Sequence, residues 1–420
     1  MTIRCATLLL ASAALSAAAA APPAGPPEDE ALARARRLLR ETILIDGHND
    51  LPWEIRTAKT APRDVEAYDL RRTTPGDTDL RRLRAGGVGG QFWSVYVPGE
   101  GRADGYAKVQ LEQIDIARRL IARYPDALEA ALTADQVERA FGRGRIASLL
   151  GMEGGHAIEN SLGALRAYYD LGVRYLTLTH NVTLDWADAA NDTARHGGLT
   201  RFGEEVVREM NRLGMLVDLS HTSPATMDDA LRVAEAPVIF SHSSARAVCD
   251  VPRNVPDAVL RRLGANGGVV MITFVAAFVS QEFADASAPA WRQFQERAAT
   301  ADAAERARLY EELDRSFRKP TVTIGQLADH FDHVRKVAGV DHIGIGADYD
   351  GNSDWPAGLE DVSRYPYLFA ELIRRGWSDA DLKKVAGGNV LRALRAAEAT
   401  ARRLQAARPP SVATIEQLDR

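Results

Sequence analysis

Residues 42–50 read Thr-Ile-Leu-Ile-Asp-Gly-His-Asn-Asp, an apolar run that ends in metal-binding residue types. A short β-rich run of this kind is typical of a buried strand in a parallel sheet. His48 and Asp50 are two residues apart, so on a strand their side chains lie on the same face. A lone His-x-Asp pair is a weak motif, and its meaning depends on what the other strands carry.

Seven more β-rich runs follow, and amphipathic helical patterns lie between most of them. The eight expected strands span residues 42–50, 89–97, 146–153, 173–180, 215–221, 238–243, 268–275 and 342–350. The clearest helical patterns span residues 161–171, 202–213, 224–233 and 256–263. This alternation predicts an α/β fold with a parallel sheet and outer helices. Eight such units predict a closed (β/α)8 TIM barrel, with an open doubly wound sheet as the alternative.

The first 21 residues predict a secretory signal peptide, residues 1–21. Arg4 precedes an apolar stretch, residues 6–21, made almost wholly of Ala, Leu and Ser and followed by a proline-rich segment. An N-terminal membrane anchor is the alternative, but so short a stretch is poorly suited to span a bilayer. We therefore expect an exported protein, periplasmic or extracellular, with no stable membrane anchor. Cleavage would remove Cys5 and leave Cys249 as the one cysteine.

The rest of the chain is expected to form one catalytic domain. Residues 22–40 are expected to be a linker or helix, residues 41–405 the barrel, and residues 406–420 a loose tail. A long insertion, residues 276–320, predicts one or two helices that act either as a lid over the barrel mouth or as a packing or oligomer contact. The net charge is −5, with 52 basic and 57 acidic residues spread along the chain. No basic patch stands out, so we expect no nucleic-acid partner.

Metal-binding residue types recur at the ends of the expected strands. The set consists of His48, Asp50, Glu153, His180, His221, His242 and Asp348. In a parallel barrel these strand ends meet at one mouth, where active sites are built. Polar residues at loop starts could explain one or two members of this set, but hardly all of it. The other histidines, among them His330 and His333, are expected to be surface or packing residues.

Five ligands, three imidazoles and two carboxylates, are too many for one tetrahedral zinc with an open position. They suit two ions if Glu153 bridges, because it comes from a strand between the two other groups. One ion would then bind His48 and Asp50, the other His221 and His242, and the two would share a hydroxide. Mixed imidazole and carboxylate ligands favour two Zn²⁺ per chain, with Co²⁺ or Mn²⁺ as rivals.

Seven stretches of the chain resemble the membrane dipeptidase (renal dipeptidase) family, peptidase family M19 of the amidohydrolase superfamily. They are DGHNDLPW (46–53), EGGH (153–156), YLTLTHN (175–181), DLSH (218–221), PVIFSHSS (237–244), RNVPD (253–257) and GADYDG (346–351). They run in the family's order, and the resemblance covers about residues 40 to 395.

The resemblance implies a metal-dependent hydrolase barrel that cleaves dipeptides, with a zinc pair on the five ligands above. It further implies that His180 polarises the substrate, that Arg253 binds the substrate carboxylate, and that Asp348 transfers the proton. Acceptance of D-residues at the C-terminal position and a homodimer are left open by the resemblance.

The chain departs from the family's animal enzymes in three respects. It lacks the cysteines that form their bridges, it has no C-terminal anchor signal, and the insertion after the seventh strand is long. These departures bear on membrane attachment and on disulfide-linked dimers, not on the catalytic set. The alternative functions are an N-acyl-amino-acid deacylase or lactonase on the same metal site, and a metal-dependent binding protein without turnover.

Overall fold

A computed structural model describes residues 29–99, 105–298, 301 and 303–419. Its centre is a ring of eight parallel strands that closes because β2 pairs with β4 as well as with β1. The closed ring confirms the (β/α)8 barrel and excludes the open sheet. The strands of the ring are β1 (Leu44–Asn49), β2 (Val88–Ser94), β4 (Ile146–Glu153), β5 (Val173–Thr177), β6 (Leu216–Asp218), β7 (Ile239–Phe240), β8 (Val269–Ile272) and β9 (Ile343–Ile345).

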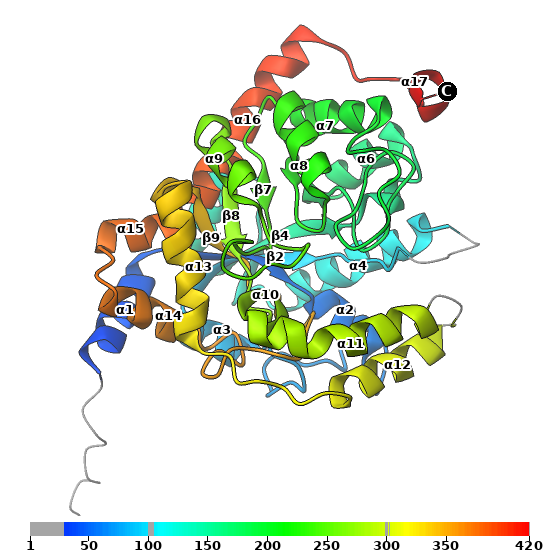
Figure 1. Cartoon of the computed structure of the whole chain (residues 1–420). Helices are drawn as coiled ribbons and strands as arrows, with labels where there is room; N and C mark the ends of the chain where they lie inside the picture. The colour runs from blue at the N-terminus through cyan, green and yellow to red at the C-terminus, as the bar shows by residue number, and fades with distance from the viewer. Residues whose placement is uncertain (1–28, 100–104, 299–300, 302, 420) are drawn as a thin grey trace, which may run out of the picture.

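Helices surround the ring (Figure 1). They are α1 (Glu30–Glu41), α2 (Leu51–Thr57), α3 (Leu80–Gly86), α4 (Ala107–Arg123), α5 (Ala134–Gly142), α6 (Leu162–Asp170), α7 (Arg201–Leu213), α8 (Pro224–Val233), α9 (Asp257–Asn266), α10 (Ala276–Val279), α11 (Gln281–Ala298), α12 (Ala303–Arg315), α13 (Ile324–Val337), α14 (Tyr365–Arg374), α15 (Asp379–Lys383), α16 (Asn389–Ala407) and α17 (Ile415–Asp419). No helix in the described ranges is both long and apolar enough to cross a membrane. The predicted signal peptide, residues 1–21, lies outside the described residues.

Helix α7 illustrates how the sequence sets the outer layer. The Thr200 side chain accepts a hydrogen bond from a backbone N–H of the first turn, and Gly214, at φ +86°, ends the helix in the left-handed conformation. Phe202, Val206 and Met210 recur every four residues and are fully buried against the barrel. The pattern that predicted this helix is therefore its core-facing stripe.

A small strand, β3 (Leu128–Ala130), was missed by the sequence analysis. It pairs in parallel with β4 outside the closed ring. At three residues it is too short to show an alternating or continuous apolar pattern, so periodicity could not detect it.

Several strands end earlier than expected, and beyond two of them the backbone turns sharply. His221 has φ +66°, Asp348 φ +75° and Asp350 φ +61°. Residues other than glycine rarely adopt this left-handed region, and it interrupts a strand. The expected ends at residues 180, 221, 243 and 350 lie in loops rather than in the sheet, and a left-handed residue accompanies this at 221 and 350.

Two glycines allow the barrel interior to close beneath the site. A Cβ on Gly346 would lie 1.8 Å from the Ser241 carbonyl oxygen, and a Cβ on Gly47 would lie 2.7 Å from the same atom. The Gly47 Cβ would also meet the Met271 sulfur at 2.4 Å. The strand that carries His48 can thus approach β7 only with glycine at this position.

The insertion after β8 forms three helices, one more than the one or two that the sequence predicted, because the short helix α10 precedes the two long ones. Helices α11 and α12 contact each other and lie side by side at one edge of the barrel (Figure 1). Trp291, Phe294 and Tyr310 pack ring against ring between them, with centroids 5.5–6.1 Å apart. The first helix, α10, lies nearer the site and places Phe278 over the Arg253 guanidinium.

The expected loose tail, residues 406–420, is instead attached to the barrel's outer layer. Asp419 in α17 accepts a hydrogen bond of 2.6 Å from the Thr200 hydroxyl at the start of α7. Arg166 of α6 donates to the Ser411 carbonyl at 3.0 Å. Polar composition predicted mobility here, but it does not reveal that the outer helices offer partners for these residues.

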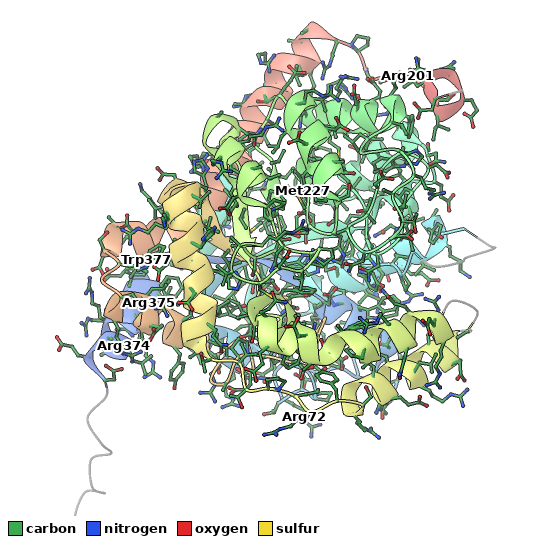
Figure 2. The ribbon with its side chains drawn as sticks, viewed as in Figure 1. Arg72, Arg201, Met227, Arg374, Arg375 and Trp377 are labelled. Carbon is green, nitrogen blue, oxygen red and sulfur yellow. The ribbon has the colours of Figure 1, made fainter. Side chains whose placement is uncertain are left out.

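Outer helices are also joined to each other by polar contacts. Arg375 and Trp377, both labelled in Figure 2, lie just beyond α14. Both donate 2.8 Å hydrogen bonds to the Asp332 carboxylate of α13. At the N-terminal end of the described chain, Arg34 of α1 forms a 2.7 Å ion pair with Asp379. The expected linker or helix is thus partly the packed helix α1.

Candidate metal centre

Seven side chains meet at the C-terminal mouth of the barrel. His48 is in β1, and Glu153 is the last residue of β4. The others lie in the loops that follow β1, β5, β6, β7 and β9, and are Asp50, His180, His221, His242 and Asp348. Their ligand atoms form three overlapping groups, in each of which all atoms lie within 4.8 Å of one another. The structure therefore brings all predicted ligands together with His180 and Asp348.

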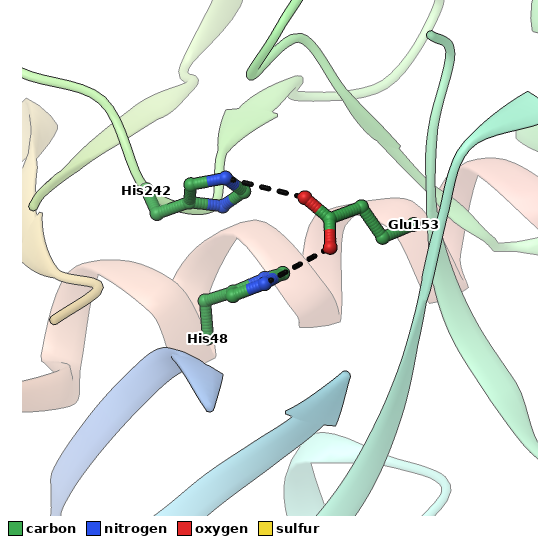
Figure 3. Close-up of side chains that lie close together, drawn as sticks. All are labelled: His48, Glu153 and His242. Carbon is green, nitrogen blue, oxygen red and sulfur yellow. Dashed lines mark ion pairs between the residues drawn. The ribbon is translucent and has the colours of Figure 1, made fainter. Parts of the chain in front are cut away.

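Glu153 lies between two groups of imidazoles. Its Oε2 is 3.3 Å from Nε2 of His48. Its Oε1 is 3.0 Å from Nε2 of His221 and 3.4 Å from Nε2 of His242. Figure 3 shows the carboxylate between His48 and His242, with a different oxygen directed at each ring. A carboxylate can bridge two ions by dividing its oxygens in this way.

Asp50, Asp348 and His180 complete the cluster at slightly greater distances. Asp50 Oδ2 is 3.2 Å from His48 Nε2, and Asp348 Oδ1 is 3.9 Å from the same nitrogen. His180 Nε2 is 3.9 Å from Glu153 Oε1, and its buried Nδ1 has no hydrogen-bond partner among the described residues. Asp348 and His180 therefore lie close enough to act on a group held at the centre.

Hydrogen bonds behind the imidazoles assign their tautomers. Tyr175 donates its hydroxyl proton to the Gly47 carbonyl at 3.1 Å, so it accepts from His48 Nδ1–H at 2.8 Å. The Asn181 amide oxygen, 3.1 Å away, accepts from His221 Nδ1–H. With the proton on Nδ1, each ring presents the lone pair of Nε2 to the centre. Oriented in this way, an imidazole is ready to bind a metal.

The third imidazole, His242, shows the same arrangement, and the cluster fits a bound cation. Its Nδ1 lies 2.8 Å from the Ser241 hydroxyl, and its Nε2 lies 2.9 Å from Nε2 of His221. Two nitrogens that both present lone pairs at this distance repel each other unless a cation lies between them. The buried Nε2 of His48 likewise faces the centre, 3.2 Å from Asp50 Oδ2 and 3.3 Å from Glu153 Oε2. Imidazole and carboxylate together suit zinc and its first-row neighbours.

Burial controls the charge of the imidazoles. Burial lowers the pKa of His180, His221 and His242 well below the usual value, and neighbouring positive groups add to the effect. The pKa of His48 lies well above its usual value. There burial is outweighed by favourable electrostatic interactions with Tyr175, Glu153 and Asp50. Three rings are thus neutral, as metal ligands must be, and the fourth is in the strongest negative field.

Burial also raises the pKa of the central carboxylates. It raises the pKa of Glu153, although His48 opposes the shift. It raises the pKa of Asp348 well above the usual value, with a further rise from Asp50 and Glu153 and opposition from His48 and Arg253. A carboxyl group with a raised pKa holds a proton more readily than an ordinary aspartate or glutamate, which is a property that a general acid–base group needs.

Arg253 is a buried cation with weak protein partners. The residue is 2% exposed, and its guanidinium lies 5.1 Å over the Phe278 ring. It donates to the Ser243 hydroxyl and to the His242 carbonyl, both at 3.4 Å. Within the described residues, no carboxylate oxygen lies within 4.0 Å of it, and burial lowers the pKa of Arg253 to about 10. A guanidinium held in this way has unused capacity for an anion.

An acid-rich cavity of about 560 Å³ opens beside the centre. Its lining includes Asp77 and Asp350, and burial, reinforced by Asp77, raises the pKa of Asp350 to about 8. A Cβ on Gly351, the next residue, would lie 2.3 Å from Asp50 Oδ2 and 2.6 Å from Asp348 Oδ1. The cavity and the metal cluster therefore meet at residues 350–351.

Other polar residues stabilise the fold or orient the ligand rings, and the sequence analysis anticipated the first group but not the second. His330 is buried and bonded to the Val279 carbonyl at 3.0 Å, and His333 pairs with Asp257 at 2.7 Å, so both are packing residues as expected. The sequence analysis did not single out the groups behind the ligand rings, which are Tyr175, Asn181 and Ser241. The sequence feature that could have identified them is a polar residue inside or next to an apolar strand run.

Comparisons with known proteins agree with this geometry. A family model for membrane dipeptidases, peptidase family M19, matches residues 32–408. The chain belongs to this family. It is 42% identical over 371 residues to dipeptidase 3 of Mus musculus, covering 87% of this chain and 66% of that protein. It is 43% identical over 384 residues to dipeptidase verJ of Clonostachys rogersoniana, covering 88% of each.

A solved structure shares the fold. The crystal structure of the probable dipeptidase PvdM from Pseudomonas aeruginosa matches with a TM-score of 0.77 and 24% identity, over 89% of this chain and 99% of that one. This likeness supports the barrel, while the assignment to the family comes from the sequence. The chain spans just under two thirds of the length of mouse dipeptidase 3.

Proposed function

We propose that this protein is a metal-dependent dipeptidase that uses two metal ions at the barrel mouth. The observation that carries the proposal is the Glu153 carboxylate, whose two oxygens face imidazole nitrogens on opposite sides. The curated relatives of the chain are named dipeptidases, which supports the substrate class. Zinc suits the ligand set best, and Co²⁺ or Mn²⁺ are the rivals.

The ligands divide into two groups. His48, Asp50 and Glu153 would hold one ion, and Glu153, His221 and His242 would hold the other. When bound, such a pair lowers the pKa of a water molecule to give the nucleophile and polarises the scissile carbonyl. The remaining steps depend on side chains that do not serve as ligands.

Asp348 is the proposed proton-transfer residue. It lies next to His48 but at 3.9 Å, farther than the 3.2 Å of Asp50. Its raised pKa allows it to take a proton from the attacking water and to deliver that proton to the leaving amine. One carboxyl group can therefore serve both halves of the reaction.

His180 and Arg253 are the proposed substrate-binding residues. His180 stays neutral because of burial, and from its position near Glu153 it can direct a ring nitrogen at the carbonyl oxygen of the substrate. Arg253 can pair with the free C-terminal carboxylate. Because the guanidinium recognises that carboxylate rather than a side chain, a D-residue at the C-terminal position is included in the proposal.

The test is a substrate screen on zinc-loaded protein. It uses a library of dipeptides with L- or D-residues at the C-terminal position, together with N-acyl-amino acids and lactones. We expect release of free amino acids from dipeptides, loss of this activity on chelation, and two ions per chain by elemental analysis. Turnover confined to acyl-amino acids or lactones would assign a different reaction to the same site, and full activity with one ion or none would contradict the two-metal arrangement.

We also propose that residues 1–21 direct export and that the barrel, residues 41–405, is the catalytic unit. The support is the basic start, the apolar middle and the small residues before the proline-rich segment. N-terminal sequencing of protein recovered from the periplasm or medium should begin near residue 21 or 22. Recovery of the full chain from the cytosol alone would contradict export.

A further inference from the structure

Asp218, at the end of β6, is a fully buried carboxylate for which the catalytic set has no use. Its Oδ1 accepts from the backbone N–H of Ser220 at 3.1 Å and of Ser241 at 2.8 Å. Its Oδ2 accepts from the Thr177 hydroxyl at 2.5 Å and from the Ser241 hydroxyl at 2.6 Å. In the described part of the chain, no basic side chain lies within 4.0 Å of it. A buried carboxylate without a cation is costly, so its retention calls for a reason.

The hydrogen-bond directions link this carboxylate to the metal centre. Because Asp218 can only accept, the Ser241 hydroxyl proton must be directed at it. The Ser241 oxygen then accepts from His242 Nδ1–H at 2.8 Å. The proton of the imidazole is thereby fixed on Nδ1, and the Nε2 lone pair is directed at Glu153 and His221.

The three supported imidazoles differ in what lies behind them. Behind His48, the Tyr175 hydroxyl accepts from the ring and donates to the Gly47 carbonyl. Behind His221, the Asn181 amide oxygen accepts from the ring. Only the chain behind His242 ends in a carboxylate. A negative charge relayed through a hydroxyl makes the ring a stronger electron donor, and it partly balances the charge of a bound cation.

We propose that Asp218, acting through Ser241, is a positioning residue that fixes the tautomer of His242 and strengthens metal binding on the His221–His242 side. The proposal rests on the metal centre proposed above. The proposal explains why a charge is buried at Asp218. Its neighbours among the described residues provide no cation, and the metal that would balance it binds to His242, two hydrogen bonds away.

The test measures zinc binding by the full chain, independently of turnover. Chelator-stripped protein is titrated with Zn²⁺ against a chromophoric chelator, and retained zinc is counted by elemental analysis. Ser241→Ala interrupts the relay. Asp218→Asn keeps the shape, but the two backbone N–H donors hold the amide oxygen on their side, so its NH₂ faces Ser241. The Ser241 hydroxyl must then donate toward His242, which moves the ring proton to Nε2.

Thr177→Val is the matched control. Thr177 and Ser241 bond to the same oxygen of Asp218 at nearly equal distances, but only Ser241 contacts His242. A merely structural role for Asp218 predicts similar effects from both substitutions. The relay predicts that zinc affinity falls about 10- to 100-fold in Ser241→Ala and at least as much in Asp218→Asn. It predicts a change below about threefold in Thr177→Val.

The outcomes separate the relay from the metal centre itself. Wild type that holds two ions, with variants at Ser241 and Asp218 that hold one at the same chelator concentration, supports the relay. Equal affinities in all four proteins, or equal losses in all three variants, would overturn it. Failure of the wild type to bind zinc would contradict the metal centre instead. If Ser241→Ala does not fold, as judged by circular dichroism, the comparison of Asp218→Asn with Thr177→Val decides the question.

Discussion

The substitution Arg253→Met tests whether the buried guanidinium binds the substrate carboxylate. The residue is 2% exposed, and its two hydrogen bonds to protein atoms are both 3.4 Å long. Removing one partner of a buried charge pair costs about 2–5 kcal/mol. At about 1.4 kcal/mol per tenfold, this is roughly a 30- to 4,000-fold loss in kcat/KM. We expect the upper half of this range, because the substrate carboxylate would then face Asp348 and Glu153 without a cation.

The assay compares a dipeptide with its C-terminal amide in steady-state kinetics. The amide lacks the charge that Arg253 binds, so the wild type should cleave it poorly and Arg253→Met should change its kcat/KM by less than about threefold. The two enzymes and the two substrates form a double-mutant cycle, which isolates the interaction energy between Arg253 and the substrate carboxylate. Arg246→Met is the matched control, because Arg246 lies in the same loop, is half-buried and donates to the Val251 and Pro252 carbonyls.

Two results would refute the carboxylate-binding role. The first is wild-type enzyme that cleaves the amide and the free acid equally well. The second is an equal loss on both substrates in Arg253→Met, which would indicate a structural role. Metal content should stay at the wild-type value in both variants, since neither side chain is a proposed ligand. A low metal content in Arg253→Met would indicate that the substitution acts by disturbing the metal centre.

Further predictions concern the groups around the metal pair. Asp348→Asn should retain both ions by elemental analysis and lose about 10²–10⁴-fold in kcat, the range for a general acid–base group; near-normal turnover would exclude this role. His180→Ala should retain both ions and lose roughly 10²–10³-fold, mainly in kcat, if it contacts the carbonyl oxygen; loss of an ion would make it a ligand. Gly346→Ala should reduce metal content and thermal stability together, because its Cβ would lie 1.8 Å from the Ser241 carbonyl oxygen; a variant with wild-type melting temperature and two ions would contradict this.

The sequence predicted the barrel and the clustering of the expected ligands because both follow from periodic and positional rules. A parallel barrel brings all its strand ends to one mouth, so residues as distant as His48 and His242 could be placed together without knowing any loop. The prediction did not extend to the backbone at those ends. His221 and Asp348 adopt left-handed conformations, which no local preference of His or Asp requires. Such strain is maintained by the surrounding packing and is common at functional sites.

The groups that orient the ligands could not be predicted for a different reason. Ser241 precedes His242 in a buried run, and Asp218 precedes His221 by three residues, so both looked like ordinary neighbours of a ligand. Their roles depend on hydrogen-bond directions between β6 and β7, which sequence spacing does not contain. The attachment of residues 409–419 to α7 and α6 was missed likewise, since it depends on partners more than 200 residues away.

The charge balance at the barrel mouth links these observations. Four buried or nearly buried carboxylates, those of Asp50, Glu153, Asp218 and Asp348, lie in or just behind the cluster, and the charge of Arg253 lowers the pKa of two of them, Glu153 and Asp348. In a region with little water, so many acids would repel one another unless cations were bound among them. The same excess explains why Arg253 remains free to bind a substrate anion. Its guanidinium is near enough to moderate the field, but within the described residues it forms no ion pair with a carboxylate.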